Sequence, residues 1–518
     1  MKFKNKTLII VLIIAIITIV LVAGFFIDYA VKSNRSTDNI GYEETKYKTD
    51  ETFSKIKNIP YDDFIKDCEV TGKSVIPKIS DSATGEKNSS AINQCIEELS
   101  ISGGGTVYIP KGKYKISSIF LKSNITLFVS KDACLISLTC SENETTDSPI
   151  FDALITAADS ENIIITGGGR ICGNGLTYTN EAENETPFYA LKEFNLYTRV
   201  IEARKRIRFG KETSRCPLIK LNSCTNSKIE NIILDESAGW TCVINNCNDI
   251  NIENMVIDNH MHVANTDGID ITGSSKVKIN NCFIATGDDG IVLKPIDNKI
   301  SDITVSNCVI SSCANCFKIG TETQFDVDNV NVSNCEFFMP DGMTYGYSGI
   351  AIESADGSNI SNVNIDNITM DGISSPLLIW LGNRMNYDNT SAGSISDIKI
   401  SNINAVNTEL PSAITGFKSD GEVHYIENIS IENFNVSYRD TEENLSVLKP
   451  VQEFSMNDYP EITRVSHYYF IEHKYSGYWD LPCYGIFVRH TKNIDYSGYN
   501  CTPRQCNNLP FLYTKDNN

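Results

Sequence analysis

Three aspartates in two short motifs have the type and spacing that could carry out chemistry. Asp267 belongs to an Asn-Thr-Asp-Gly segment, and Asp288 and Asp289 lie together in a Gly-Asp-Asp-Gly segment. Neighbouring carboxyl groups repel one another when both are ionised, so their pKa values move apart. A protonated carboxyl group and an ionised one are what glycosidic hydrolysis needs, the first to donate a proton and the second to activate water.

Two plainer interpretations of these motifs stay open on the residues alone. Aspartate before glycine is common in turns, and for an isolated pair of motifs this would be the better interpretation. Clustered aspartates in a groove also suit calcium. What separates these interpretations is whether the chain brings the two motifs together.

A repeat along the chain predicts that it does. An apolar residue, any residue and an asparagine, usually followed by another apolar residue, recur with the asparagine at positions 231, 254, 281, 307, 334, 367, 402 and 433. The units contain short alternating runs rich in Ile and Val and no amphipathic helix, which predicts an all-β parallel solenoid. The 21 residues between Asp267 and Asp288 approach one repeat, so both should lie on adjacent coils, and we expect the asparagines to form an inward-facing ladder.

The two ends of the solenoid have their own signals. Helical spacing of apolar residues from Ser89 to Leu99 predicts a helix that caps the open end, and residues 102–112 read as a glycine-rich turn entering a strand. One interruption, from Asn184 to Arg215, is rich in arginine and lysine. It is either a solvated helix face or a basic flap beside a substrate groove.

The N-terminus predicts the location. Lys2, Lys4 and Lys6 precede an uncharged apolar run from Leu8 to Ile27, long enough for one transmembrane helix. We expect residues 1–28 to be a signal anchor or a removed signal peptide, residues 29–75 a polar tether, and residues 76–518 the solenoid domain. The domain would lie on the extracellular side of the membrane, or be secreted.

Composition excludes several classes of protein. The 518 residues carry 45 basic and 65 acidic side chains, a net charge of −20, which disfavours nucleic-acid binding. With 41% hydrophobic residues the chain is neither disordered nor a polytopic membrane protein. The 17 cysteines match no zinc pattern, and Cys501 and Cys506 are the plausible disulfide. We expect a monomer.

At the two aspartate motifs the chain resembles family 28 glycoside hydrolases, the polygalacturonase family, whose motifs are N-T-D, G-D-D one coil later, G-H-G and R-I-K. The similarity runs from about Ile76 to the C-terminal region and includes residues 168–175 and 481–490. It implies a right-handed parallel β-helix and inverting hydrolysis of pectic polysaccharide without metal or cofactor. It also implies that Asp288 is the general acid, that Asp267 and Asp289 hold and activate the water, and that Asn265 contacts the substrate.

The later motifs depart from the family. Residues 315–317 are Asn-Cys-Phe in place of G-H-G, and Ala351 and Glu353 stand where the arginine and lysine of R-I-K hold the galacturonate carboxylate. Glu353 would repel that carboxylate but accept hydrogen bonds from neutral sugar hydroxyls. The cations that would substitute from neighbouring positions are Lys294, Lys318 and Arg384.

Three functions therefore compete. The leading one is an extracellular hydrolase of pectic polysaccharide, specific for polygalacturonate or for another linkage such as rhamnogalacturonan. The second is a calcium-dependent lyase on the same solenoid, and the third is a solenoid that only binds glycans or adheres to surfaces. Trp240, Trp380, His260 and His262 are weaker candidates for sugar contacts.

Overall fold

The computed structural model describes residues 61–150, 152–178, 215–261, 263–339, 348–383, 392–408, 410–419, 421–438, 481, 483–502 and 510–515. The predicted N-terminal helix, most of the tether, the basic segment up to residue 214, His262 and Arg384 lie outside these residues. Among the described residues, no helix has the length and apolar character needed to cross a membrane.

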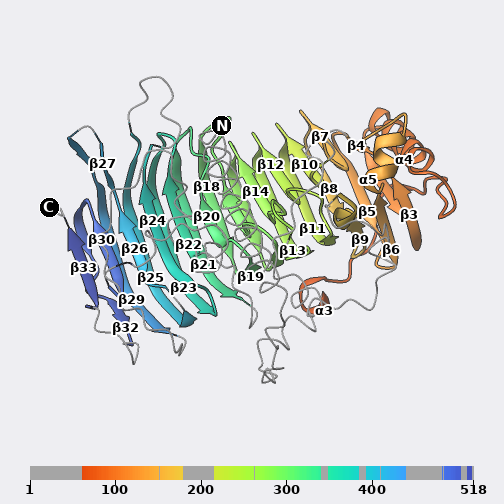
Figure 1. Cartoon of the computed structure of the whole chain (residues 1–518). Coiled ribbons are helices and arrows are strands. Elements are labelled where there is room, and N and C mark those ends of the chain that lie inside the picture. The colour runs from red at the N-terminus through yellow and green to blue at the C-terminus, as the bar shows by residue number, and fades with distance from the viewer. Residues whose placement is uncertain are drawn as a thin grey trace, which may run out of the picture. The chain divides into compact units, whose positions relative to one another are not determined.

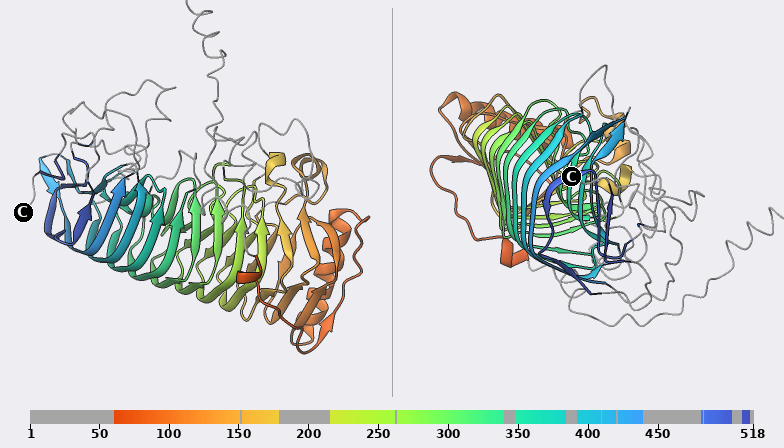
Figure 2. Two further views of the ribbon diagram at one scale, coloured as in Figure 1. Left: turned by 90° about the horizontal axis from the view of Figure 1, so that it is seen from below. Right: turned by 90° about the vertical axis from the view of Figure 1, so that its left-hand side faces the viewer.

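The described residues form stacked coils of parallel strands (Figures 1 and 2), which confirms the predicted solenoid. One side is a sheet of 12 described strands in which each strand pairs with its counterpart one coil away. Its strands are β4 (Ile119–Leu121), β7 (Ile155–Ala158), β10 (Ile219–Asn222), β12 (Cys242–Asn245), β14 (Ile269–Thr272), β17 (Ile291–Leu293), β20 (Asn315–Ile319), β22 (Ser348–Ser354), β24 (Ser375–Leu381), β26 (Ser412–Thr415), β30 (Ile486–Arg489) and β33 (Leu512–Lys515).

The other two sides belong to one bent sheet of 19 described strands. They are β1 (Ser74–Val75), β2 (Gly105–Ile109), β3 (Gly112–Ile116), β5 (Ile125–Val129), β6 (Ala133–Ser137), β8 (Ile164–Thr166), β9 (Arg170–Cys172), β11 (Thr225–Asp235), β13 (Asn248–Asp258), β15 (Ser275–Asn280), β16 (Phe283–Thr286), β18 (Ile300–Ser306), β19 (Val309–Ser312), β21 (Val327–Phe338), β23 (Asn359–Asp371), β25 (Ser394–Thr408), β29 (Ile426–Tyr438), β31 (Thr491–Asp495) and β32 (Tyr499–Cys501). Strands β27 (Phe417–Ser419) and β28 (Glu422–His424) form a small separate antiparallel hairpin.

The repeated asparagine marks the bend in this sheet. All eight asparagines of the motif have a positive φ of 48° to 55°, a left-handed conformation that asparagine tolerates better than most residues. Their amides do form a ladder between coils: Asn281 Nδ2 donates to Asn254 Oδ1 at 2.7 Å, and Asn367 Nδ2 donates to Asn334 Oδ1 at 2.7 Å. The predicted inward direction was wrong, because the left-handed corner turns these side chains outward, and Asn367 is exposed.

The interior is filled by aliphatic side chains in register. The residue two positions before each asparagine pairs with its equivalent in the next coil, as in Ile229 with Ile252 and Ile252 with Ile279, and all three are fully buried. Each coil therefore adds another layer to one continuous core. Among the described cysteines, Cys282, Cys308 and Cys335 are buried free thiols in this stack, and Cys501 is also a free thiol. Cys506, the predicted disulfide partner of Cys501, lies outside the described residues.

The N-terminal end is closed as predicted. Helix α4 (Gly85–Ile101) begins after Thr84, whose hydroxyl accepts from the Lys87 N–H, and it buries Ile92 and Ile96 against the first strands (Figure 1). Two other short helical elements are α5 (Cys140–Thr145) and the 3-10 turn η1 (Gly175–Tyr178).

The end of the predicted tether differs from the expectation. Residues 61–75 include helix α3 (Tyr61–Phe64) and strand β1, which pairs with β2. Phe64 is buried, with its ring edge-on to Phe283 at 5.7 Å, and the Lys66 N–H donates to Asn231 Oδ1 at 3.0 Å. Burial of Phe64 and of the neighbouring Ile65 explains why this mostly polar stretch packs on the solenoid.

Candidate active site

The 12-stranded sheet positions the two aspartate motifs on adjacent coils. Asp267 lies just before β14, and Asp288 and Asp289 lie in the turn between β16 and β17. Strands β14 and β17 pair in parallel, with Ile269 opposite Ile291, so the two motifs stack. Gly287 is needed for this stacking, because a Cβ there would lie 2.2 Å from the Val263 carbonyl oxygen.

The three predicted catalytic carboxylates come together. One oxygen from each of Asp267, Asp288 and Asp289 lies within 4.8 Å of the other two. Asp267 and Asp289 are almost fully buried, and Asp288 is half-buried. Asp288 Oδ2 accepts from the Asn265 N–H at 2.8 Å, so the predicted substrate contact Asn265 also orients the predicted acid.

The backbone of the second motif is held by two hydroxyl groups. Thr286 Oγ1 and Ser312 Oγ both donate to the Asp288 carbonyl oxygen, at 2.7 and 2.6 Å. Ser312 belongs to the next coil, where it ends β19. The turn that carries Asp288 and Asp289 is therefore fixed from both sides.

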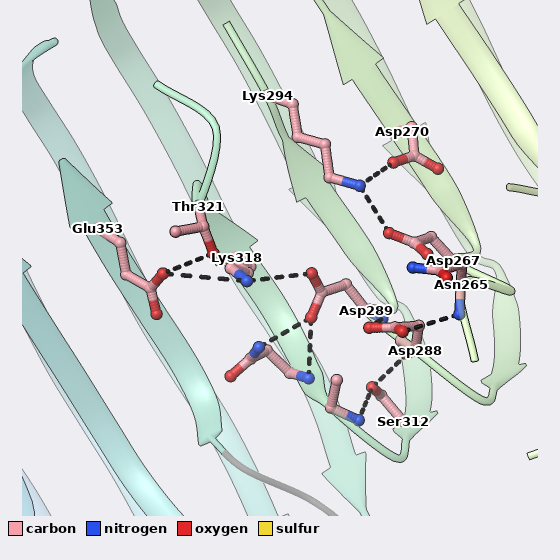
Figure 3. Close-up of polar contacts among 12 residues, drawn as sticks. Asn265, Asp267, Asp270, Asp288, Asp289, Lys294, Ser312, Lys318, Thr321 and Glu353 are labelled. Carbon is pink, nitrogen blue, oxygen red and sulfur yellow. Dashed lines mark hydrogen bonds and ion pairs between the residues drawn. The ribbon is translucent and has the colours of Figure 1, made fainter. Parts of the chain in front are cut away.

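Lys294 joins the first motif to a carboxylate that the sequence-based prediction left without a role. Its Nζ lies 2.7 Å from Asp267 Oδ2 and 2.7 Å from Asp270 Oδ1 (Figure 3). The same Nζ lies 3.9 Å from the centroid of the Trp240 ring. All three ion-pairing side chains are at least 95% buried. Alternation along β14 could have identified Asp270, because Ile269 and Ile271 face the core and leave Asp270 on the outer face.

Burial and these contacts shift the protonation of the group. Burial raises the pKa of Asp267 well above its usual value, against the opposing effect of Lys294. Burial likewise raises the pKa of Asp270 to about 6, again opposed by Lys294. Burial alone would lower the pKa of Lys294, but Asp267 and Asp270 raise it above its usual value. Lys294 is therefore a permanent cation beside two acids of unequal tendency to ionise.

A second lysine serves the other motif in the same way. Lys318 Nζ lies 3.3 Å from Asp289 Oδ2 and 3.9 Å from Glu353 Oε2, and Thr321 Oγ1 donates to the same Glu353 oxygen at 3.2 Å (Figure 3). Asn315 donates to Asp289 Oδ1 through both its backbone N–H at 3.2 Å and its Nδ2 at 2.8 Å. Asn315 was missed because it is the first residue of β20 and its side chain does not follow the alternation of Phe317 and Ile319, and Thr321 was missed because it follows the strand, where spacing predicts no direction.

The structure shows where the residues lie that replace the G-H-G and R-I-K motifs. Cys316 is fully buried in the hydrophobic core, so its thiol points away from the carboxylates, and Asn315 is the residue of that segment that contacts Asp289. Ala351 pairs with Lys318 in the sheet. The predicted contact Lys318 thus occupies the coil before the one in which the expected cations are missing.

The remaining candidates divide into near and far. Arg215, the end of the predicted basic segment, reaches the site: its Nη1 donates to Asn265 Oδ1 at 3.2 Å. Trp380 is buried in an apolar cluster with Leu378 and Phe487, which favours packing over sugar stacking. His260 is almost buried, and its carbonyl oxygen accepts from the Val263 N–H.

The chain that carries this site is similar to known proteins. The family model described as "Glycosyl hydrolases family 28" matches residues 100–454. The endo-polygalacturonase of Pectobacterium carotovorum subsp. carotovorum is 24% identical over 263 residues, 51% of this chain and 52% of that protein. The chain thus spans about half the length of this relative.

Two solved structures share the fold. The exopolygalacturonase of Thermotoga maritima has a TM-score of 0.56 at 18% identity, covering 75% of this chain and 92% of its own. The family 28 exopolygalacturonase of Yersinia enterocolitica has a TM-score of 0.58 at 16% identity, covering 86% of this chain and 78% of its own. At this level of identity the likeness concerns the β-helix.

Proposed function

The chain belongs to glycosyl hydrolases family 28, and we propose that it hydrolyses glycosidic bonds in pectic polysaccharide. The observation that carries the proposal is the meeting of Asp267, Asp288 and Asp289 within 4.8 Å on two coils. Each of the two almost buried members has its own lysine, Lys294 for Asp267 and Lys318 for Asp289. Such a group can hold protonated and ionised carboxyls side by side, as hydrolysis requires.

In the proposed mechanism the three aspartates have separate tasks. Asp288, the most exposed of the three, donates a proton to the leaving glycosidic oxygen. Asp267 and Asp289 hold and activate the attacking water. Because burial raises the pKa of Asp267 well above its usual value, the proton of the water passes to Asp289, whose negative charge Lys318 stabilises. Asn265 keeps the Asp288 carboxylate turned toward the other two.

Inversion at the anomeric carbon is proposed from the family resemblance alone. Inverting enzymes usually separate their acid and base by about 6.5–9.5 Å, whereas the nearest oxygens of this trio lie within 4.8 Å. NMR of the first product formed tests the proposal: the inverted anomer is expected, and the anomer of the substrate would refute inversion.

The contacts of the two lysines favour hydrolysis over a lyase, and the close approach of the three carboxylates favours it over a purely adhesive function. A lyase needs a free basic side chain and calcium, but Lys294 and Lys318 each contact two carboxylates. The oxygen donors of the trio would also suit a divalent cation, so the role of metal has to be tested directly. A purely adhesive solenoid has no need of three carboxylates brought this close together, since like charges there are costly.

We also propose that the domain works outside the cytoplasm, held by an uncleaved N-terminal helix. The support is the sequence of residues 1–28, with Lys2, Lys4 and Lys6 before the apolar run. Sedimentation of the full-length protein with membranes from an expressing cell, and its release when residues 1–28 are deleted, is the expected result. Recovery of the intact chain in the soluble fraction would refute the anchor.

A reducing-end assay on a panel of pectic polysaccharides, with and without EDTA, tests the activity. We expect cleavage of at least one polysaccharide, unaffected by EDTA and reduced by a factor of at least about 10² in Asp288→Asn. The matched control is Asp302→Asn on the exposed side of β18, which should retain full activity. Cleavage lost with EDTA would indicate a metal-dependent enzyme, and binding without any cleavage would indicate the adhesive function.

A further inference from the structure

Lys318 and Glu353 form a buried ion pair beside the proposed catalytic trio. They lie on the outer face of neighbouring strands β20 and β22, with side chains 6% and 0% exposed. Thr321 donates a hydrogen bond to the Glu353 oxygen that faces Lys318 (Figure 3). A carboxylate buried this deeply is retained only when charged and polar partners hold it.

The position of Glu353 determines which groups neutralise the ammonium group of Lys318. With Asp289 on one side at 3.3 Å and Glu353 on the other at 3.9 Å, the ammonium group is balanced by two acids of the protein. Lys294 is likewise held between Asp267 and Asp270. Neither lysine of the described site therefore presents an uncompensated charge to a substrate.

Strands β22, β24 and β26, which follow β20 in the sheet, carry no lysine or arginine. The first cation in register with them is Arg489 of β30, which is fully buried and whose Nε donates to Thr415 Oγ1 at 3.2 Å. The outer-face positions of β22, β24 and β26 that follow Lys318 and Glu353 in register are occupied by Ala351, Leu378, Ala413, Trp380 and Thr415. The first four belong to an apolar cluster, and Trp380 pairs directly with Glu353. Among these described positions a sugar carboxylate would meet an apolar surface or the Glu353 carboxylate, and both disfavour it.

We propose that Glu353 sets the specificity of the site: by holding Lys318 against Asp289, it makes the adjacent subsite select a sugar unit without negative charge. This inference rests on the proposed hydrolase function and narrows its substrate class. The unit seated there is a neutral sugar or a galacturonate whose carboxyl group is esterified. Glu353 acts through Lys318 and is a positioning residue.

The test compares oligogalacturonides of one length in methyl-esterified and free-acid form. For the full-length wild-type protein, kcat/KM should be at least about tenfold higher on the esterified form. In Glu353→Gln the charge of Lys318 is released, so the ratio should move toward the free acid by about tenfold, through a lower KM for the acid. Glu432→Gln, which removes the same charge from an exposed position on β29, should leave the ratio unchanged.

A second variant keeps the inference testable if Glu353→Gln unfolds. Thr321→Val removes the hydrogen bond to Glu353 without changing charge, and it should shift the ratio in the same direction by a smaller factor. A wild-type preference for the free acid, or a ratio that neither variant changes, would overturn the inference and leave the hydrolase function intact.

Failure of the proposed function itself has a different signature. If the wild-type protein cleaves neither oligosaccharide, the hydrolase proposal fails on these substrates, and calorimetric binding of the same two oligosaccharides tests Glu353 instead. Tighter binding of the esterified form, with a preference that falls by about tenfold in Glu353→Gln, supports the inference. Equal binding of the two forms refutes it.

Discussion

The buried acidic residues of the site are held in pairs, each pair by one lysine. Asp267 and Asp270 share Lys294, while Asp289 and Glu353 share Lys318. Buried carboxylates cost free energy unless a cation and hydrogen bonds stabilise them. The two lysines make it possible to bury four acidic side chains next to the half-buried Asp288.

The pKa of Asp270 gives a prediction at this scale. Burial raises it from 3.8 to about 6 in the folded protein, so folding favours the protonated form. The contribution of Asp270 to stability is present below about pH 4 and is lost as pH rises to about 6. We expect the free energy of unfolding of wild type, relative to Asp270→Asn, to fall by on the order of 2–3 kcal/mol over this window.

Urea unfolding of both proteins at pH 4 and pH 7 measures this difference. A difference that stays constant, or that grows in favour of wild type as pH rises, would mean that Lys294 outweighs burial and lowers the pKa of Asp270. The comparison within one pair of proteins removes the titration of acidic groups remote from Lys294, so the difference reports on Asp270 and on Asp267, which shares that lysine.

At the scale of elements, the asparagine corner is what lets one sheet cover two sides of each coil. Asn402 adopts a φ of 55°, its Nδ2 donates to Asp366 Oδ1 at 2.8 Å, and its Oδ1 accepts from Asn433 Nδ2 at 2.9 Å. The backbone conformation and the ladder therefore contribute separately to stability.

Two substitutions at Asn402 should separate these contributions. Asn402→Gly keeps the left-handed backbone and loses the ladder bonds, at a cost of about 1 kcal/mol. Asn402→Val loses the bonds and also strains the backbone, which should cost about 1–2 kcal/mol more. Chemical denaturation gives the free energies of unfolding.

The control is Asn404 on the same strand, an exposed asparagine outside the left-handed region. Asn404→Val should be near neutral, because valine suits a strand. Equal losses for Asn402→Gly and Asn402→Val would show that the left-handed backbone conformation does not explain why asparagine recurs at this corner of the chain.

Several elements were predictable from the sequence, and the reason is physical. Periodic Ile and Val with a repeated asparagine gave the coils, and the spacing of Ile92, Ile96 and Leu99 gave the cap. The direction of the asparagine side chains was not predictable from spacing alone. It depends on the left-handed φ at positions such as Asn367, which appears only when the chain bends between two strands.

Within the site, the aspartates of the two motifs were predictable because one repeat separates them. The partners were harder to predict: Asp270 required knowing which face of β14 is outward, and Thr321 follows β20, where spacing predicts no direction. Lys318 and Glu353 were named as separate candidates. That they bind each other follows only from the stacking of β20 on β22.

At the scale of the whole molecule, the net charge of −20 matches the local charge of the site. The site contains five acidic side chains, the three of the trio included, and two lysines. Arg215 adds one more cation at Asn265. An anionic polysaccharide would be repelled at long range and would find each lysine already balanced. The charge of the whole molecule thus supports the proposed preference for neutral or esterified sugar units.

In the proposed hydrolysis, the trio uses water to break the glycosidic bond. The most direct measurement is mass spectrometry of oligosaccharides released from esterified pectin in water enriched in oxygen-18. We expect one oxygen-18 atom in each newly formed reducing end with wild-type protein, and at least about 10²-fold less of this product with Asp288→Asn. Unsaturated products without the label, or labelled products from Asp288→Asn at the wild-type rate, would contradict it.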